Sequence, residues 1–261
     1  MGLKVGEVRL EQHNDNWELM FAKEVEELWE YFGDVALRIS HIGSTAVDGL
    51  EAKPIIDIAI AVNDLSDFDS VSEKFVDDPD YSIKKGGDPD EILIRKGPEK
   101  NRSYYIHVMD IDSKRYKNTI VFRDTLLSDE RIRNDYRALK HHLAEKYPNN
   151  RKKYTSSKAD FIDTTLDMVW ARTPLMPLAV ITCVMAVTFG LSLWARLTFV
   201  KNPSILGLPL FNICHAGMFI GAGIGIVCLG ATIVLLVRYI QSSKRYNRIV
   251  AKIPKRARKE A

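Results

Sequence analysis

Apolar and charged positions divide the chain into two contrasting parts. Residues 1–172 alternate short apolar runs with charged stretches, whereas residues 173–261 contain two long runs without any charge. The first pattern is typical of a soluble domain, and the second is typical of helices that cross a membrane. We therefore expect a folded domain over residues 1–170, a transmembrane hairpin over residues 171–240 and a basic tail over residues 241–261.

Four segments of the first part have the pattern of strands. Residues 54–62 are almost entirely apolar, which indicates a largely buried strand, and the other three segments mix apolar with polar positions. A short turn or helix is expected over residues 45–50, between the first two strands. The expected strands are residues 35–40, 54–62, 88–96 and 103–110.

Helical spacing dominates the rest of this domain. Trp17, Phe21 and Leu28 recur at helical intervals, and the last third of the domain has long helical patterns with a break at residues 147–150. The expected helices are residues 16–31, 64–75, 113–127, 129–146 and 156–170. A sheet in the first half and helices in the second half predict an α+β fold.

Two apolar stretches have the length of membrane spans. The first, residues 175–195, holds 21 residues without a charge. A helix needs about 20 such residues to cross the hydrocarbon core of a bilayer. The second uncharged stretch is residues 203–237, and we expect its helix at about residues 213–237 because Pro203, Gly207 and Pro209 favour a loop before it.

The distribution of charge predicts the orientation of these spans. Residues 1–172 carry 26 Lys and Arg against 33 Asp and Glu, whereas residues 173–261 carry 11 against one. Nine of these 11 follow the second span, so the positive-inside rule places both the tail and the N-terminal domain in the cytoplasm. We expect the tail to touch anionic lipid headgroups, and the overall charge of +3 gives no reason to expect nucleic-acid binding.

Three glycines of the second span share one helix face, because Gly217, Gly221 and Gly225 recur at every fourth residue. Such a face allows another helix to approach closely. It favours either packing within the hairpin or association of two copies of the chain, and the spacing does not separate these two alternatives.

Candidate chemistry lies between His41 and Val62. Gly43 and Ser44 form a turn after the first expected strand, and Asp57 interrupts the apolar run of the second. The backbone N–H groups and the hydroxyl of such a turn suit a phosphate, and a carboxylate on the next strand suits a divalent metal that bridges to it. Alternatively, Asp57 is a structural acid that its local hydrogen bonds satisfy.

This order of strand, Gly-Ser turn, helix and strand with Asp resembles the nucleotidyltransferase superfamily. Within it, HIGSTAVDGLEAKPIIDI at residues 41–58 is similar to the signature of the GrpB family, which has proline where this chain has Asp48. The resemblance implies a nucleotidyltransferase-like mixed sheet with a C-terminal helical half over roughly residues 8–169. Five further blocks resemble that family in the same order: IRKG at 94–97, RSYYIHV at 102–108, FRD at 122–124, YRALK at 136–140 and YTSSKADFI at 154–162.

The family resemblance implies a candidate nucleotidyltransferase that acts on or binds a nucleotide or another phosphorylated small molecule. Asp57 is its predicted metal ligand, for Mg²⁺ or Mn²⁺. The superfamily carries a second acid two residues further along the same strand face, but this chain has Ala59 there. That difference favours the alternative of a non-catalytic binding or scaffold module tethered to the membrane, so the sequence leaves enzymatic activity open.

Roles for individual residues follow from the matched blocks. His107 is a candidate base or metal ligand beside Asp57, or else a strand histidine that is hydrogen-bonded within a polar cleft. His41 is expected to orient the turn. Basic residues of the blocks, Arg123 among them, are candidate anion contacts, although solvent exposure or local ion pairs explain each one separately. The predicted catalytic residues are Asp57 and His107, and the predicted phosphate contacts are Gly43, Ser44, Thr45, Lys53, Arg95, Arg102, Lys140 and Lys158.

Overall fold

The structure is a computed structural model that describes residues 2–3, 6–84, 88–98, 100–199, 208–254 and 257–258. Contacts within the chain divide it into two units. Met1–Leu166 and Arg248–Ala261 form the first unit, and Asp167–Asn247 form the second. Most of the expected basic tail, Arg248–Ala261, is therefore grouped with the first unit.

A five-stranded mixed sheet lies at the centre of the first unit, in the order β1-β2-β5-β4-β3. The pair β2 and β5 is parallel, and the other neighbouring pairs are antiparallel. The predicted α+β fold with a mixed sheet is confirmed, whereas β3 was missed because three residues are too few for an alternating pattern. The strands are β1 Arg38–Ile42, β2 Ile56–Val62, β3 Tyr81–Ile83, β4 Ile92–Lys96 and β5 Tyr104–Asp110.

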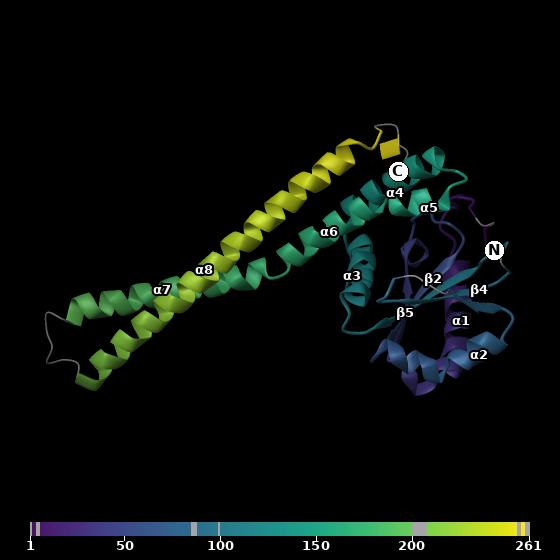
Figure 1. Ribbon diagram of the computed structural model, residues 1–261. Helices are drawn as coiled ribbons and strands as arrows, with labels where there is room; N and C mark the ends of the chain where they lie inside the picture. Colours follow the sequence, from purple (N-terminus) through teal and green to yellow (C-terminus); the bar gives the residue numbers. More distant parts are fainter. Residues whose placement is uncertain are drawn as a thin grey trace. The chain divides into compact units, whose positions relative to one another are not determined.

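One face of the sheet packs against α1 (Asn16–Phe32) and α2 (Ser72–Asp77), which lie on the same side of it in Figure 1. The even-numbered residues of β2 are all isoleucine or valine, and they join apolar side chains of both helices in the main core. Side chains alternate between the two faces of a strand, so the odd-numbered residues must point the other way.

The opposite face of the sheet carries Asp57 and is covered by α3 (Lys114–Ser128). Ala59 packs there against Tyr116 of that helix. Because β2 and β5 pair in register, His107 lies opposite Ala59 on the same face. Strand alternation therefore turns both predicted catalytic residues toward the helical half of the domain.

The helical half follows the predicted pattern closely. Ser113, Asp129 and Asn150 each cap a helix by accepting a hydrogen bond from the backbone N–H three residues later. The predicted helices over residues 113–127, 129–146 and 156–170 are confirmed, and an additional short helix begins directly after the predicted break. Besides α3, this half contains α4 Glu130–Lys146, α5 Arg151–Ser156 and α6 Ala159–Arg172.

Residues 64–75 do not form the single helix that their spacing predicts. They form a 3₁₀ helix, Leu65–Ser70, followed by α2. The hydroxyl groups of Ser70 and Ser72 each donate to a backbone carbonyl three residues earlier, which competes with continued helical hydrogen bonding. The first strand also begins later than predicted, because a 3₁₀ turn occupies Gly33–Val35.

The second unit contains α7 (Leu175–Phe199) and most of α8 (Leu208–Ala251). Two helices in the described part of the chain are long and apolar enough to cross a membrane, with mean hydropathies of 2.1 and 2.0 in their most apolar windows. The helix α8 begins before the expected residue 213, because Pro209 stands in its first turn, where a missing N–H breaks no helical hydrogen bond. Residues 203–207 of the expected loop lie outside the described residues.

Gly225 of α8 faces α7. A Cβ at this glycine would lie 3.4 Å from the Cβ of Met185, so the glycine contributes to packing within the hairpin. The surroundings of Gly217 and Gly221 lie outside the described side chains. Association of two copies through this face stays a prediction.

A buried ion cluster joins α1 to the far strands of the sheet. The Nζ of Lys96 lies 2.8 Å from a carboxylate oxygen of Glu24 and 2.6 Å from one of Glu27, and the Tyr81 hydroxyl donates to Glu24 over 2.7 Å. Burial raises the pKa of Glu24, although Lys96 and Tyr81 oppose that change. Lys96 thus supplies the positive charge that a buried carboxylate requires.

Candidate functional site

The turn between β1 and β2 lies directly against Asp57. Ile42, the last residue of β1, pairs with Asp57 across the two strands. Gly43 follows with a φ of +72°, and a Cβ on it would lie 2.5 Å from Oδ2 of Asp57. Both the backbone conformation and the close approach therefore require glycine. Ser44 then begins the short 3₁₀ helix Ser44–Ala46.

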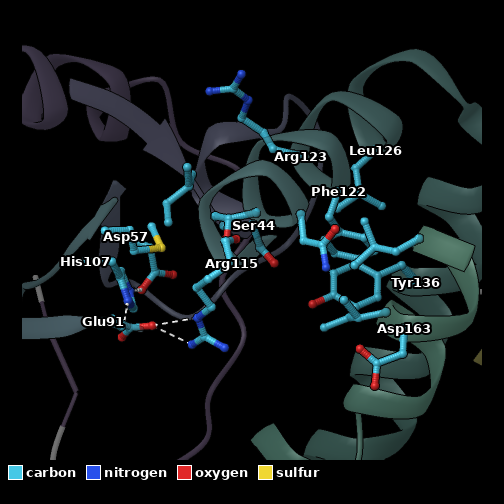
Figure 2. Close-up of a pocket in the computed structure, with 17 residues that line it drawn as sticks. Ser44, Asp57, Glu91, His107, Arg115, Phe122, Arg123, Leu126, Tyr136 and Asp163 are labelled. Carbon is cyan, nitrogen blue, oxygen red and sulfur yellow. Dashed lines mark hydrogen bonds and ion pairs between the residues drawn. The ribbon is translucent and has the colours of Figure 1, made fainter. Parts of the chain in front are cut away.

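A pocket of about 350 Å³ opens on the helix-facing side of the sheet and is bordered by α3, α4 and α6 (Figure 2). Its volume lies within the usual range for small-molecule sites. Four of the predicted site residues come together in it: Gly43, Ser44, Asp57 and His107. The other lining residues are Ile42, Glu91, Met109, Arg115, Asn118, Thr119, Phe122, Arg123, Leu126, Tyr136, Ile162, Asp163 and Leu166.

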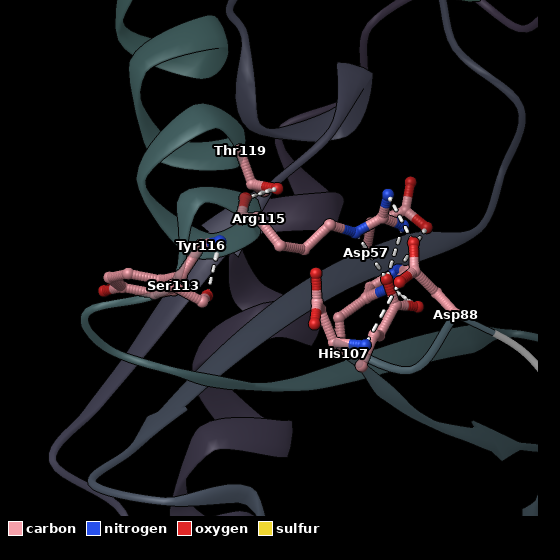
Figure 3. A network of polar contacts seen from close by, with 9 residues as sticks. Asp57, Asp88, His107, Ser113, Arg115, Tyr116 and Thr119 are labelled. Carbon is pink, nitrogen blue, oxygen red and sulfur yellow. Dashed lines mark hydrogen bonds and ion pairs between the residues drawn. The ribbon is translucent and has the colours of Figure 1, made fainter.

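A chain of alternating charges runs along one side of this pocket (Figure 3). The His107 ring lies between two acids, with Nε2 3.8 Å from Asp57 Oδ1 and Nδ1 2.8 Å from Glu91 Oε1. The Arg115 guanidinium donates to the other Glu91 oxygen over 2.8 Å and 2.5 Å, and it lies 3.2 Å from Asp88. Both oxygens of the Glu91 carboxylate are therefore engaged.

The two acids determine the protonation state of His107. Burial alone would lower the pKa of this histidine, but the carboxylates of Asp57 and Glu91 outweigh burial and raise the pKa to about 9. Burial would likewise raise the pKa of Glu91, yet His107 and Arg115 lower it to about 2. At neutral pH His107 is therefore an imidazolium that can donate hydrogen bonds but neither accepts a proton nor binds a metal. This arrangement favours a cationic role over the predicted role as base.

The acids of the pocket do not fit a two-metal centre. Ala59 occupies the position of the second acid, and the two oxygens of Glu91 accept hydrogen bonds from other side chains. Among the residues that the structure describes, no three His, Cys, Asp or Glu side chains converge as metal ligands. Asp57 would be the protein ligand of a single Mg²⁺ or Mn²⁺, with water supplying most of the remaining ligands.

Helices α3 and α4 hold the Gly-Ser turn in place. Arg123 donates through Nη1 to the carbonyl oxygen of His41 over 3.0 Å. The buried Tyr136 hydrogen-bonds with Ser44, and burial raises the pKa of its phenol well above the ordinary value. The position of the Ser44 hydroxyl therefore depends on both strands and helices.

Four further predicted or weighed residues lie outside the pocket lining. Thr45 is buried, and its hydroxyl lies 3.0 Å from Nε2 of His41, whose ring stacks on Phe21. Burial lowers the pKa of His41 to about 4, so this histidine is a neutral, structural partner of the turn. Arg102 donates to the carbonyl oxygen of Gly97, and Arg95 belongs to β4 without lining the pocket.

The three predicted lysines also lie outside the pocket lining, but they gather near one another. Lys53 and Lys158 both lie over the ring of Tyr154, and Lys140 lies over the ring of Tyr136. Lys53 and Lys158 are also close enough to Asp57 to interact with its charge. The predicted phosphate contacts thus divide into a turn that faces the pocket and a separate group of lysines.

Comparison with known proteins agrees with the fold. Residues 7–168 match the model of the GrpB protein family. The chain belongs to the GrpB family. The resemblance found in the sequence motifs is therefore confirmed, and the matched residues end close to the start of the second unit.

Relatives of the chain include proteins of two bacilli and one solved structure. Glutamate-rich protein GrpB of Alkalihalophilus pseudofirmus is 33% identical over 64% of this chain and 98% of that protein. The UPF0157 protein YqkA of Bacillus subtilis is 29% identical over 58% of this chain and 44% of that protein. The crystal structure of the conserved protein GrpB from Enterococcus faecalis has a TM-score of 0.55 and 29% identity, over 60% of this chain and 94% of that one.

Several pocket residues of this GrpB domain were not predicted from the sequence. The largest group lies on α3 at intervals of three and four residues, so that one face of the helix meets the pocket. The helix was predicted correctly, and the helical spacing of its polar residues was the signal that would have found this face. The residues of α3 that line the pocket are Arg115, Asn118, Thr119, Phe122 and Leu126, together with Arg123, which the sequence had already indicated as a candidate anion contact.

Replacing Gly43 by alanine tests the contact between the turn and Asp57. Gly49 is the matched control, because its φ of +69° is similar to the +72° of Gly43 but nothing lies within 4 Å of a Cβ there. Each substitution places a side chain at a positive φ, and the ψ of −166° at Gly43 adds strain, because that region is essentially restricted to glycine. We expect Gly43→Ala to lower the free energy of unfolding clearly more than Gly49→Ala in chemical denaturation of the full chain. Equal losses would show that the turn does not press on Asp57.

Titration of His107 tests the charge chain. The imidazole signal that His107→Gln removes should titrate with a pKa of about 9 in histidine-labelled protein. Asp57→Asn and Glu91→Gln should each lower that pKa. Because the folded pKa lies above the ordinary value of about 6.5, His107 stabilises the fold below pH 6.5 and loses this contribution as the pH rises through 9. An unshifted pKa near 6.5 would contradict the assignment.

Proposed function

We propose that the GrpB domain binds a nucleotide or another phosphorylated small molecule in this pocket. The observation that carries the proposal is that the Ser44 turn, the Asp57 carboxylate and the His107 imidazolium line one cavity. A phosphate in that cavity can accept hydrogen bonds from the Ser44 hydroxyl and from Nε2 of His107. A divalent cation at Asp57 would offset the repulsion between the carboxylate and the phosphate.

The two walls of the pocket differ in polarity, which supports a ligand with a charged end and an organic end. Asp57, His107 and Glu91 lie together on one side in Figure 2, and Phe122 and Tyr136 lie on the other, where Asp163 is the acidic side chain. An aromatic wall suits a nucleobase or another apolar group, because such groups gain most from burial and stacking. The pocket of about 350 Å³ can hold a molecule of this size.

The charges around the pocket agree better with a protein that only binds its ligand than with one that transfers a nucleotidyl group. Ala59 supplies no second carboxylate, and His107 holds its proton between two acids. Nucleotidyl transfer is the second candidate function, because Asp57 still directs a carboxylate into the pocket and can hold one metal ion.

A ligand screen on the full chain in detergent tests the binding proposal. The panel consists of nucleoside mono-, di- and triphosphates and sugar phosphates, each with Mg²⁺, with Mn²⁺ and with a chelator. Ser44→Ala should weaken binding about tenfold, because it removes a hydrogen bond to a charged group. Asp57→Asn should remove the part of the affinity that depends on metal. The exposed residues Ser66 and Asp69 provide the control variants Ser66→Ala and Asp69→Asn.

The outcomes of this screen separate the two candidate functions. Turnover that Asp57→Asn abolishes while ligand binding persists would identify a transferase. Binding without turnover in the unaltered chain would identify a binding module. If neither Ser44→Ala nor Asp57→Asn changes the affinity or turnover of any compound, the pocket is not the site.

We also propose that α7 and α8 anchor this domain to a membrane as a hairpin. Their apolar windows are not buried within the structure, so their apolar side chains require another covering. The basic residues that follow the second window favour a cytoplasmic position for both ends of the hairpin. This arrangement would keep the GrpB domain and its pocket on the cytoplasmic face.

Fractionation and protease protection test the anchor. The full chain, with one tag at each terminus, should remain in the membrane fraction after washing at high pH. Protease should remove both tags from inside-out vesicles and neither tag from sealed right-side-out vesicles. Recovery of the chain in the soluble fraction would refute the anchor, and tags on opposite sides would refute the hairpin.

A further inference from the structure

Three lysines gather around two buried tyrosines beside the pocket. The Nζ of Lys158 lies 4.7 Å from the ring centroid of Tyr154, and the Nζ of Lys53 lies 5.6 Å from the same centroid. The Nζ of Lys140 lies 5.3 Å from the ring centroid of Tyr136. We call Lys53, Lys140 and Lys158 the lysine cluster.

The members of the lysine cluster are withdrawn from water, and the acids near them, Glu51 beside Lys140 and Asp57 beside Lys53 and Lys158, lie beyond ion-pair distance. Lys140 is 1% exposed and donates to the backbone carbonyl of Glu51, and the other two lysines are half-buried. In the part of the chain that the structure describes, none of the three forms an ion pair with an acidic side chain. Folded proteins usually pair a buried charge, because an uncompensated one costs several kcal/mol.

The contrast with Lys96 shows how this chain treats a buried lysine elsewhere. Lys96 contacts the carboxylates of Glu24 and Glu27 over 2.8 Å and 2.6 Å, and its pKa is raised despite burial. In the lysine cluster the pKa values are lowered and not raised. Burial, together with the charges of Lys158 and Arg151, lowers the pKa of Lys53 to about 7, and burial lowers that of Lys158 to about 8.

Two further features indicate that the cluster is arranged for an anion. Arg151, which interacts with the charge of Lys53, is held by donating to the Tyr105 hydroxyl over 3.0 Å and to the carbonyl of Glu7. Asp57 is near Lys53 and Lys158, but it also belongs to the pocket and faces His107. Glu51, the other carboxylate whose charge reaches the cluster, is already paired with Arg137, so two carboxylates shared in this way cannot neutralise several cations.

We propose that the lysine cluster is a second ligand subsite, separate from the pocket, that binds a phosphoryl group. Ammonium groups are compact charges whose N–H donors rotate freely, so several of them can each meet a different oxygen of a tetrahedral phosphate. A planar carboxylate is better matched by the flat fork of an arginine. The subsite goes beyond the function proposed for the pocket, and together the two sites select ligands with two separated acidic groups.

Calorimetry on the full chain in detergent tests the subsite, with inorganic phosphate and pyrophosphate as probes and sodium chloride to hold the ionic strength constant. The double variant Lys53→Met, Lys158→Met keeps the apolar stems and removes two charges. We expect it to bind both probes at least about tenfold more weakly. We also expect it to unfold at a higher temperature, because the repulsion between the two cations is gone.

Lys96→Met is the matched control, because it removes a buried lysine that has its own acids. It should unfold at a lower temperature and leave the affinity for both probes within about twofold. Ser44→Ala tests the pocket separately, so a failure of the pocket proposal leaves this prediction intact. Undiminished probe binding by the double variant would overturn the subsite, as would the absence of probe binding in the unaltered chain. Malonate that binds as tightly as phosphate would overturn its assignment to a phosphoryl group.

Discussion

The pairing of β1 with β2 is the constraint on which the site depends. It sets the last residue of β1 opposite Asp57, so the turn that follows must pass directly over a carboxylate. Only a residue without a side chain fits there, which is why Gly43 precedes Ser44. Strand alternation then turns Asp57 and His107 to the helix-covered face, away from the main core. The lone acid of β2 is therefore compatible with a buried strand.

The charges around Asp57 are more strongly coupled than their separation in the sequence indicates. On one side, His107 and Arg115 share the carboxylate of Glu91 and form a chain of opposite charges. On the other side, lysines from different parts of the chain approach without forming an ion pair in the described structure, and the acids whose charges reach them are Asp57 and Glu51. The Lys140 amino group even reaches the backbone of Glu51, 89 residues away. Asp57 thus lies between a balanced network and an excess of positive charge.

The sequence predicted most of the architecture because periodicity is a local property. Helical spacing identified α1, α3 and α4, and apolar runs identified β2 and both apolar helices of the second unit. The turn and Asp57 were predicted as neighbours because they lie on consecutive expected strands, and His107 was added through the family resemblance. Glu91 belongs to the strand expected over residues 88–96, but it was not predicted as a site residue, because no local pattern indicates its contact with His107. The separation of the lysines from the pocket was also missed, because it depends on how α4 and α6 pack and not on local spacing.

Alanine suits position 59 because of the residue opposite it on the sheet, His107. Ala59 is fully buried and lies opposite His107, whose charge is already balanced by Asp57 and by Glu91. A third carboxylate there would add a buried charge without a partner. The Nε2 of His107 lies 3.8 Å from Asp57, which is longer than a hydrogen bond, so its proton is available to a nearby acceptor. In the function proposed for the pocket, an incoming phosphate would accept a hydrogen bond from this imidazolium.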